Sequence, residues 1–330
     1  MKTILTHLYQ HKTFSKEEAK NILIDIASGK YNHSQIASFL TAFIMRNITL
    51  DELRGFRDGL LSLCNKLDFS EYKPMDVCGT GGDGKNTFNI STLTAFVLAG
   101  AGVPVSKHGN YGVSSISGSS NVLEYLGVHF QTDESILKTQ LSQAGICFLH
   151  APLFHPAMKY VAPVRKELGV KTFFNMLGPL VNPSQPSIQM VGVFNLELAR
   201  MYQYLFQEEN IQYCIVHSLD GFDEITLTAD CRIINNEGEQ IVTQKDFQFN
   251  KVEYQDLYGG NTVKESAEIF MSIISGKGTI AQNNVVIANA AMAIKTYYPD
   301  VSITQAIEQA TQSLLSLKAK QSFTILKEIQ

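Results

Sequence analysis

The 330-residue sequence predicts an α/β fold in which a small N-terminal helical domain precedes a larger domain with a mostly parallel sheet flanked by helices. Residues 1–70 carry apolar side chains at helical spacing. From Pro74 onward, short apolar segments alternate with helical segments, and glycine-rich turns follow two of the apolar segments. A chain of 330 residues is long for one core, so we expect two unequal domains, residues 1–70 and 71–330.

The helical domain is predicted from start signals and from one apolar face. Ser15 with Glu18 and Thr49 with Glu52 have the spacing of capping boxes, in which each side chain caps the other's backbone N–H. A further helix is expected over Ser34–Met45. Its apolar positions are Ile36, Phe39, Leu40, Phe43 and Ile44. Together they form more apolar surface than a lone small helical bundle would bury, so they indicate either a dimer contact or burial inside the helical domain.

The first glycine-rich turn lies in Asp76–Ser91, between an apparent strand over Met75–Cys78 and an apparent helix. Glycines let backbone N–H groups approach an anion, and the helix that follows turns its free N–H groups and positive dipole end to the same place. The segment therefore predicts an anion site, and phosphate is the ligand that such turns commonly bind.

Two familiar phosphate motifs fit this turn only in part. Gly79–Gly84 has the G-x-G-x-x-G spacing of dinucleotide folds, but those folds need an acidic residue after the second strand, where this chain has Lys107 and His108. Gly79–Lys85 also fits G-x-x-x-x-G-K of nucleotide triphosphatases, yet Asn86 stands where Ser or Thr would ligate magnesium. Neither motif is therefore favoured.

A second loop, Lys107–Ser120, follows an expected strand over Val103–Val105 and is rich in glycine and serine. Short hydroxyl donors suit phosphate, and Lys107 would add a mobile point charge. The alternative is a flexible solvent loop, which the same composition would favour. The position of the loop after a strand and before a helix favours the ligand loop.

Later segments complete the predicted sheet. Strands are expected over Gly145–Leu149 and Tyr213–His217, and Asp223–Glu224 follow the second of these strands. Adjacent carboxylates at a strand end are candidate Mg²⁺ ligands, because Mg²⁺ is commonly held by one or two carboxylates together with substrate phosphates. The alternative is an ordinary acidic turn. The proline-containing stretch 171–186 is expected to return the chain to the helical domain.

Together these segments resemble the anthranilate phosphoribosyltransferase family. The resemblance is carried by Gly79–Asp83, Asn89–Thr92, Lys107–Asn110 and Asp223–Glu224. It extends to His155–Lys159, Ala162–Gly169 and Asn175–Pro183, and so covers nearly the whole chain. It implies a cytoplasmic homodimer, paired through the helical domain, that transfers the phosphoribosyl group of phosphoribosyl pyrophosphate to the amine of anthranilate with Mg²⁺.

The resemblance also implies residue roles. The donor phosphoribosyl pyrophosphate would contact Gly79, Gly82, Asp83, Thr87, Asn89, Ile90, Ser91, Thr92, Lys107, His108, Gly109, Asn110, Tyr111, Gly112, Val113, Ser114, Ser115 and Ser119. Anthranilate would contact Gly79, Asn110 and Arg165. Ser91 with Glu224 would hold one Mg²⁺, and Asp223 with Glu224 a second. No acid or base catalyst is expected, because the amine of anthranilate is already an uncharged nucleophile and His108 then serves as a positioning donor.

Some of these residues have alternative interpretations. The planar fork of Arg165 matches a carboxylate, but Arg165 could instead form a surface ion pair with Glu167. His155 suits either a substrate channel or ordinary packing. Many family members carry arginine and lysine where this chain has Tyr111 and Ile116. The second loop therefore lacks two positive charges that those members carry. This difference bears on the identity of the substrate more than on the type of reaction.

Composition excludes several other classes. A composition of 45% hydrophobic and 18% charged residues is typical of a globular protein. The net charge of −4 gives no sign of the basic surface that nucleic-acid binding requires. The five cysteines lack C-x-x-C spacing and indicate reduced thiols in a cytoplasmic protein. We expect no signal peptide and no membrane helix. A pyrimidine nucleoside phosphorylase-like enzyme is the main alternative function, but Asp223–Glu224 argue against it.

Overall fold

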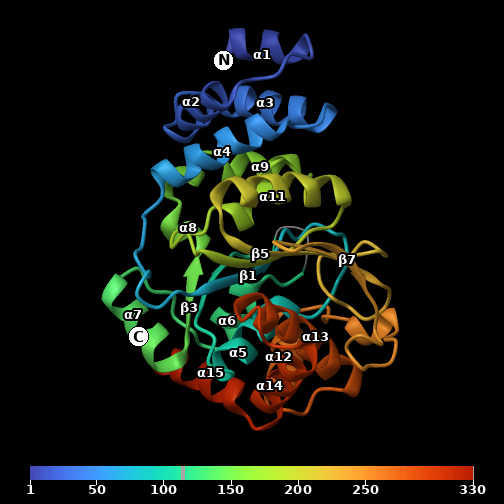
Figure 1. Cartoon of the computed structure of the whole chain (residues 1–330). Helices are drawn as coiled ribbons and strands as arrows, with labels where there is room; N and C mark the ends of the chain where they lie inside the picture. Colours follow the sequence, from blue (N-terminus) through green and yellow to red (C-terminus); the bar gives the residue numbers. More distant parts are fainter. Residues whose placement is uncertain (113–115, 330) are drawn as a thin grey trace. The chain divides into compact units, whose positions relative to one another are not determined.

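The computed structural model describes residues 1–112 and 116–329, and it divides the chain into two compact units (Figure 1). The first unit comprises Met1–Leu67 and Ala151–Pro183, and the second comprises Asp68–His150 and Ser184–Gln330. The chain leaves the first unit at Leu67, near the boundary expected at residue 70. It returns at Ala151, well before the stretch 171–186 in which the prolines had indicated a return.

The first unit is built from helices. They are α1 (Lys2–Tyr9), α2 (Lys16–Ala27), α3 (His33–Met45), α4 (Leu50–Leu63), α8 (Ala151–Phe154), α9 (Ala162–Leu168) and α10 (Phe174–Leu177), with 3-10 turns η1 (Pro156–Tyr160) and η2 (Gly178–Leu180). Both predicted capping boxes are confirmed, with Ser15 and Glu18 at the start of α2 and Thr49 and Glu52 at the start of α4. Asn32 and Gln35 form a further capping box at the start of α3, which was not predicted from the sequence.

Four phenylalanines form the centre of this unit. Phe39 and Phe43 of α3 pack edge-on against Phe56 of α4, and Phe173 stacks on Phe56 with ring centroids 4.5 Å apart. Ile36 and Leu40 are buried as well. Of the apolar positions predicted on α3, only Ile44 is exposed, at 45%. The surplus apolar face is therefore explained mainly by burial inside the helical unit.

A buried carboxylate ties α4 to the chain segments around it. Glu52 is fully buried, and its oxygens accept hydrogen bonds from the backbone N–H groups of Phe14 and Thr49, at 3.0 and 2.9 Å. Arg46 forms an ion pair with the same carboxylate. A buried charge is tolerated only when it is paired and fully hydrogen-bonded, and these partners meet that condition.

The second unit contains a seven-stranded sheet in the order β3-β2-β1-β4-β5-β6-β7. The strands are β1 (Met75–Gly79), β2 (Val105–Gly109), β3 (Ile146–His150), β4 (Ile188–Gly192), β5 (Gln212–Ser218), β6 (Cys231–Asn235) and β7 (Gly238–Val242). β1 to β5 run parallel, β6 is antiparallel to β5, and β7 is antiparallel to β6. The order reverses at β1, so β2 and β4 lie on its two sides; ligands of such sheets bind at the carboxyl ends of the strands near this reversal.

Several strand predictions needed correction. The strand expected over Val103–Val105 was wrong, because Val103 closes the end of the preceding helix by donating to the carbonyl of Leu98, and Pro104 has no N–H to donate. The strand starts at Val105 instead. Strands β4, β6 and β7 were not predicted. β7 is mostly exposed and β4 directly follows a proline-rich turn, so neither stands out as an apolar run.

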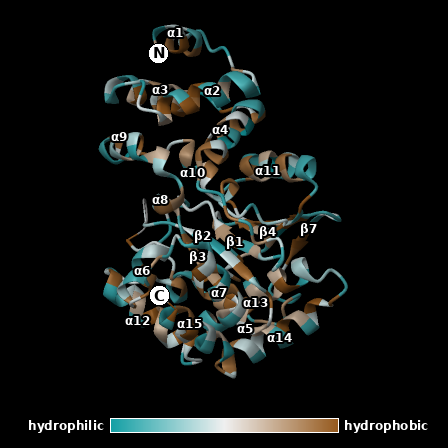
Figure 2. Ribbon diagram, turned by 90° about the vertical axis from the view of Figure 1, so that its left-hand side faces the viewer, coloured by the Kyte–Doolittle hydropathy of each residue, from teal (hydrophilic) through white to brown (hydrophobic). Residues whose placement is uncertain are grey.

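Helices cover both faces of this sheet, as predicted. They are α5 (Ile90–Gly100), α6 (Ser119–Tyr125), α7 (Glu134–Ala144), α11 (Leu196–Glu209), α12 (Val263–Ile274), α13 (Ile280–Tyr297), α14 (Ile303–Leu315) and α15 (Lys318–Glu328), with a 3-10 turn η3 (Tyr254–Leu257). α11 packs on one face and α5 and α13 on the other (Figures 1 and 2). The outer helices α12 and α14 carry both hydrophilic and hydrophobic segments in Figure 2, as expected for helices with one buried face.

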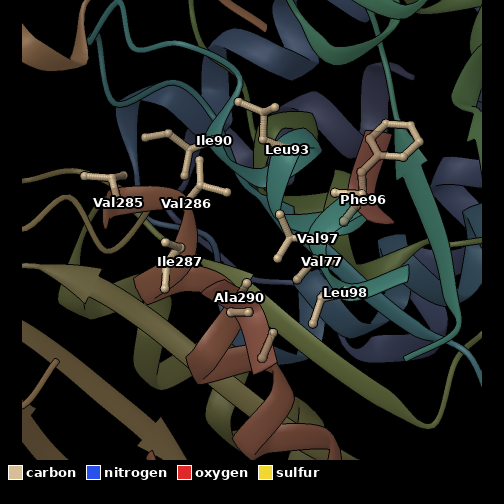
Figure 3. Close-up of a cluster of buried hydrophobic side chains, with 14 of the residues drawn as sticks. Val77, Ile90, Leu93, Phe96, Val97, Leu98, Val285, Val286, Ile287 and Ala290 are labelled. Atoms are coloured by element: carbon tan, nitrogen blue, oxygen red, sulfur yellow. The ribbon is translucent and has the colours of Figure 1, made fainter. Parts of the chain in front are cut away.

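Helix α5 is apolar on all sides because it is buried between the sheet and other helices. Leu93, Phe96 and Val97 are fully buried, and the cluster in Figure 3 joins them to Val77 of β1 and Val286 of α13. A helix enclosed on every side has a fixed position and direction. The start of α5, which directly follows the first glycine-rich turn, is therefore rigidly placed.

Among the described residues, no helix is both long and apolar enough to cross a bilayer. Cys64, Cys78, Cys147, Cys214 and Cys231 are all free thiols.

Replacing Glu52 by alanine should destabilise the protein by about 3 kcal/mol, because the Arg46 guanidinium and two backbone N–H groups would lose a buried partner. Asp51 is the matched control: it neighbours Glu52, pairs with Arg54 and is 60% exposed, so Asp51→Ala should cost under about 1 kcal/mol. Urea unfolding followed by circular dichroism measures both. Equal losses for the two variants would contradict the structural role of the Glu52 network.

Candidate active site

The carboxyl ends of β1 and β4 bring the first loop, Gly79–Asn89, to the point where the strand order reverses. Gly79 pairs with Gly192 in the sheet register, and the N–H of Thr80 donates to the carbonyl of Gly192 at 2.9 Å. The loop therefore starts at the place where parallel sheets of this type bind ligands.

The backbone of the first loop needs glycine. Gly81 and Gly82 have φ of +62° and +77°, the left-handed region that residues with a Cβ rarely adopt. This conformation turns the N–H of Gly81 toward the Asp223 carboxylate, whose Oδ2 accepts it at 2.7 Å. The first loop and the acidic pair, which are far apart in the sequence, are thus in direct contact.

A segment near η3 braces the far end of the loop. Thr87 forms a β-bridge with Tyr258, and the N–H of Phe88 donates to the carbonyl of Leu257 at 2.9 Å. The Lys85 ammonium lies over the rings of Phe222 and Tyr254, at 4.9 and 5.4 Å from their centroids. Lys85 thereby links the first loop to Phe222, the residue just before the acidic pair. In a nucleotide triphosphatase motif, the lysine at this position would contact phosphate instead.

The acidic pair lies after β5, in contact with three other elements. Asp223 is buried, and its backbone packs so closely on Gly192 that a Cβ at residue 192 would lie within bonding distance of the Asp223 carbonyl oxygen. Gly79 is equally restricted, since a Cβ there would collide with the Asp223 carboxylate. The N–H of Ser91 donates to Glu224 Oε1 at 3.3 Å. Both carboxylates are therefore held by backbone groups, each through one oxygen.

Burial makes two charged carboxylates at this position costly. It raises the pKa of Asp223, with the nearby charge of Asp83 adding to the effect. It raises the pKa of Glu224 well above its usual range, and the charges of Asp223 and Asp83 raise it further. A bound divalent cation would offset both the desolvation and the repulsion.

The structure corrects the expectation that Lys107 is a mobile charge in the second loop. Lys107 is part of β2 and only 2% exposed. Its ammonium donates to the carbonyl of Val77 at 2.6 Å and to Ser91 Oγ at 3.4 Å. Burial lowers the pKa of Lys107, while the negative charges of Asp76 and Glu224 oppose that shift. Lys107 is a fixed internal cation that lies close to the acidic pair.

The donor set around Ser91 suits magnesium. A serine hydroxyl and two carboxylates are hard oxygen ligands, which Mg²⁺ prefers. The described residues contain no group of three or more His, Cys, Asp or Glu side chains that could hold a metal by themselves. One hydroxyl and two carboxylates are the kind of ligands with which Mg²⁺ keeps waters and completes its coordination with phosphate oxygens.

The described part of the second loop lies next to the first. Asn89 Nδ2 donates to the carbonyl of Ser117 at 3.2 Å, which joins the two loops. The Tyr111 hydroxyl donates to Glu124 at 3.2 Å, and the Tyr111 ring packs edge-on against His150. Ile116 is 46% exposed. Val113, Ser114 and Ser115, which were expected to belong to the donor site, lie outside the described residues.

The other expected donor contacts fall on the same elements. Gly82, Asp83 and Thr87 are in the first loop, Ile90 and Thr92 begin α5, His108 and Gly109 end β2, and Asn110, Gly112 and Ser119 are in the second loop. Ile90 and Thr92 are almost fully buried, so they can offer a ligand their backbone N–H groups but little of their side chains. The N–H of His108 donates to Asp76 Oδ1 at 3.2 Å.

Two candidates belong to the first unit. Arg165 Nη2 donates to Asn175 Oδ1 at 3.3 Å, and the guanidinium lies 5.4 Å from the ring centroid of Phe174. Burial lowers the pKa of Arg165, and no ion pair with Glu167 is found among the described residues. His155 is buried with Nε2 against the carbonyl of Val181 at 2.8 Å, and burial lowers its pKa to about 4, so ordinary packing accounts for it.

Comparisons with known proteins place both units in one family. Residues 71–320 match the model described as "Glycosyl transferase family, a/b domain", and residues 2–64 match "Glycosyl transferase family, helical bundle domain". The chain is 60% identical over 329 residues to an anthranilate phosphoribosyltransferase of Flavobacterium johnsoniae, covering 100% of this chain and 99% of the relative. It is 50% identical to the enzyme of that name from Bacteroides fragilis, with the same coverage.

Solved structures are similar over nearly the full length. The crystal structure of anthranilate phosphoribosyltransferase from Thermus thermophilus has a TM-score of 0.90 at 29% identity and covers 99% of this chain and 98% of its own. Anthranilate phosphoribosyltransferase from Saccharomyces cerevisiae, solved in complex with PRPP and Mg, has a TM-score of 0.89 at 26% identity and covers 99% and 97%.

Replacing Gly192 by alanine should displace the acidic pair, because its Cβ would overlap the Asp223 carbonyl oxygen. We expect a loss of about 2–3 kcal/mol in stability, typical of overpacking. Gly178 is the matched control: it has helical dihedrals and a Cβ there meets nothing within 4 Å outside its chain neighbours, so Gly178→Ala should cost under about 1 kcal/mol, the residual cost coming from Pro179, which disfavours a Cβ on the preceding helical residue. Thermal unfolding followed by circular dichroism compares the two. A Gly192→Ala protein as stable as the wild type would rule out this contact.

Proposed function

The chain belongs to the anthranilate phosphoribosyltransferase family, and from this membership we propose that it transfers the 5-phosphoribosyl group from phosphoribosyl pyrophosphate to the amine of anthranilate. The products are N-(5-phosphoribosyl)anthranilate and pyrophosphate, a step of tryptophan biosynthesis. The observation that carries the proposal is the contact of the first loop with the acidic pair, Gly81 N–H to Asp223 Oδ2 at 2.7 Å. It joins an anion-binding turn to cation ligands, as a magnesium diphosphate requires.

We assign the donor's phosphates to the two loops. The backbone N–H groups of the first loop and the start of α5 supply donors and a positive dipole end. As pyrophosphate leaves the ribose, negative charge builds up on its oxygens, and donors that are already in place stabilise that charge without reorganising. The rigid burial of α5 keeps these groups in place.

We assign Mg²⁺ to Ser91, Asp223 and Glu224. Bound Mg²⁺ would supply neutralisation of the diphosphate charge. Two ions are proposed, one at Ser91 and Glu224 and the other at Asp223 and Glu224. The fixed charge of Lys107, which bonds Ser91 Oγ, helps to offset the acidic pair on the protein side.

We propose no acid or base catalyst. The anthranilate amine attacks as an uncharged nucleophile, so positioning and electrostatic stabilisation carry the reaction. His108 remains assigned to the donor site as a positioning donor; it is buried at the end of β2, where its backbone N–H donates to Asp76 Oδ1.

We assign the acceptor to Gly79, Asn110 and Arg165. The Arg165 guanidinium has a neutral amide and an aromatic ring as its described partners, which leaves its charge available for the carboxylate of anthranilate. Gly79 lies directly against the Asp223 carboxylate, beside the proposed Mg²⁺ ligands.

The oligomeric state and the cellular location are proposed as well. We propose a homodimer through the helical unit, to which the exposed Ile44 and Met45 at the end of α3 would contribute apolar surface. We also propose a cytoplasmic location, which free thiols at all five cysteines support.

Changing Asp223 to Asn together with Glu224 to Gln should lower turnover at least about 100-fold, because the cation loses its charged ligands. The assay mixes protein, Mg²⁺, phosphoribosyl pyrophosphate and anthranilate, and follows anthranilate consumption and pyrophosphate release. Glu208→Gln with Glu209→Gln, an exposed adjacent pair in α11, removes the same charge as a control. Full activity in the first double variant would reject the metal assignment, and nucleoside phosphorolysis by the wild type would favour the phosphorylase alternative.

Replacing Arg165 by alanine should raise the KM for anthranilate about tenfold or more, with little change in the KM for phosphoribosyl pyrophosphate, because a charge-assisted bond to the acceptor is lost. Lys166→Ala, a neighbouring exposed cation, is the control and should leave both constants near the wild type. An unchanged anthranilate KM in Arg165→Ala would assign Arg165 a structural role with Asn175.

A further inference from the structure

The side chain of Asn121 joins the two sides of the second loop. Its Oδ1 accepts the N–H of Gly112 at 2.9 Å and the N–H of Gly118 at 3.0 Å. Asn121 lies in the first turn of α6, and Gly112 and Gly118 are two backbone positions of the second loop, six residues apart. One carbonyl oxygen thus holds together two points that are separated in the sequence.

The two sides are in direct contact at this point. A Cβ at Gly118 would lie 2.3 Å from the Gly112 nitrogen and 2.7 Å from the Asn110 carbonyl oxygen. Only glycine permits this approach. The narrow neck of the loop therefore depends on the absence of a side chain at residue 118 and on the shared acceptor at residue 121.

Further bonds surround the neck. The carbonyl of Asn110 accepts the N–H of Ser120 at 3.2 Å and the Ser119 hydroxyl at 3.4 Å. On the other side, the carbonyl of Ser117 accepts from Asn89 of the first loop. The neck is thus connected directly to Asn89, a residue expected at the donor, and to Asn110, a residue expected at both donor and acceptor.

We propose that Asn121 is a positioning residue for phosphoribosyl pyrophosphate, an inference that rests on the proposed function. It contacts no substrate itself. By holding Gly112 and Gly118 together before the donor arrives, Asn121 keeps the adjacent backbone of Asn110 and Ser119 in place for donor binding. Asn110 is assigned to anthranilate as well, but the carboxylate of anthranilate is assigned to Arg165 in the first unit, so loss of the neck should affect the acceptor less than the donor.

Helix capping is the competing explanation, because the bond from Gly118 N–H also caps α6. The bond from Gly112 N–H distinguishes the two roles, since Gly112 lies outside the helix. A capping role alone predicts lower stability with both substrate constants unchanged. A positioning role predicts a specific change in the KM for the donor.

The test compares three variants of the full-length protein. Asn121→Ala removes the shared acceptor, Asn121→Asp keeps an acceptor oxygen at the same place, and Tyr125→Ala changes an exposed side chain on the same helix, 55% exposed, as a matched control. KM values for phosphoribosyl pyrophosphate and for anthranilate are measured separately. Hydrogen–deuterium exchange of peptides spanning residues 108–121 is measured without substrates.

Asn121→Ala should raise the KM for phosphoribosyl pyrophosphate about tenfold, as expected for the loss of two hydrogen bonds, and speed exchange at the neck, with the anthranilate KM within about twofold of the wild type. Asn121→Asp and Tyr125→Ala should stay within about threefold of the wild type in both constants. An unchanged donor KM in Asn121→Ala, or an equal rise for both substrates, would overturn the proposal.

A second variant keeps the proposal testable if Asn121→Ala fails to fold. Gly118→Ala forces the neck open from the other side, and it should reproduce the rise in the donor KM and the faster exchange. A normal donor KM in Gly118→Ala would equally count against the proposal. If wild-type protein showed no transfer with these substrates, the proposed function would fail, and the exchange measurements would still decide whether Asn121 closes the neck.

Discussion

The site depends on one packing constraint: the acidic turn after β5 lies against the carboxyl ends of β1 and β4 without room for a side chain between them. Gly79 and Gly192, paired in the sheet, both face Asp223, and a Cβ at either position would collide with it. Because the strand order reverses at β1, this is also where the first loop leaves the sheet. The backbone amide of Gly81 and the carboxylate of Asp223 are in contact as a consequence.

That contact concentrates charge in a buried place, and the surrounding residues balance it in part. The charges of Asp223, Asp83 and Lys107 all act on Glu224, and burial disfavours the charged forms of Lys107, Asp223 and Glu224. Lys107 is held by the carbonyl of Val77 and by Ser91, so its charge cannot swing out to meet a ligand. The protein therefore contributes one fixed cation, and the remaining negative charge favours a divalent ion that arrives with the donor.

The loops that carry the ligand groups are held mainly by bonds from side chains to backbone. Asn89 links the first loop to the second, Asn121 closes the neck of the second, and Asn86 donates to the carbonyl of Gly260. The carboxamide suits this work because it can donate and accept at fixed positions without adding charge beside an anion site. Helix α5, enclosed by hydrophobic contacts on all sides, supplies the rigid base on which the first loop is mounted (Figure 3).

Local sequence determined the parts of this protein that depend on neighbours along the chain. The capping boxes at Ser15 and Thr49, the helices that follow them, the glycine-rich turn after β1 and the serine-rich segment after β2 were predictable, because caps and turns are encoded within a few residues. Strands β4, β6 and β7 were not, since their apolar patterns are short and they form only through pairing with distant strands. The tertiary structure alone decided the burial of Lys107, the close contact of Gly192 with Asp223, and the two hydrogen bonds that Asn121 Oδ1 accepts. Each of these results from close approach between segments that a linear sequence keeps apart, and no local propensity specifies such an approach.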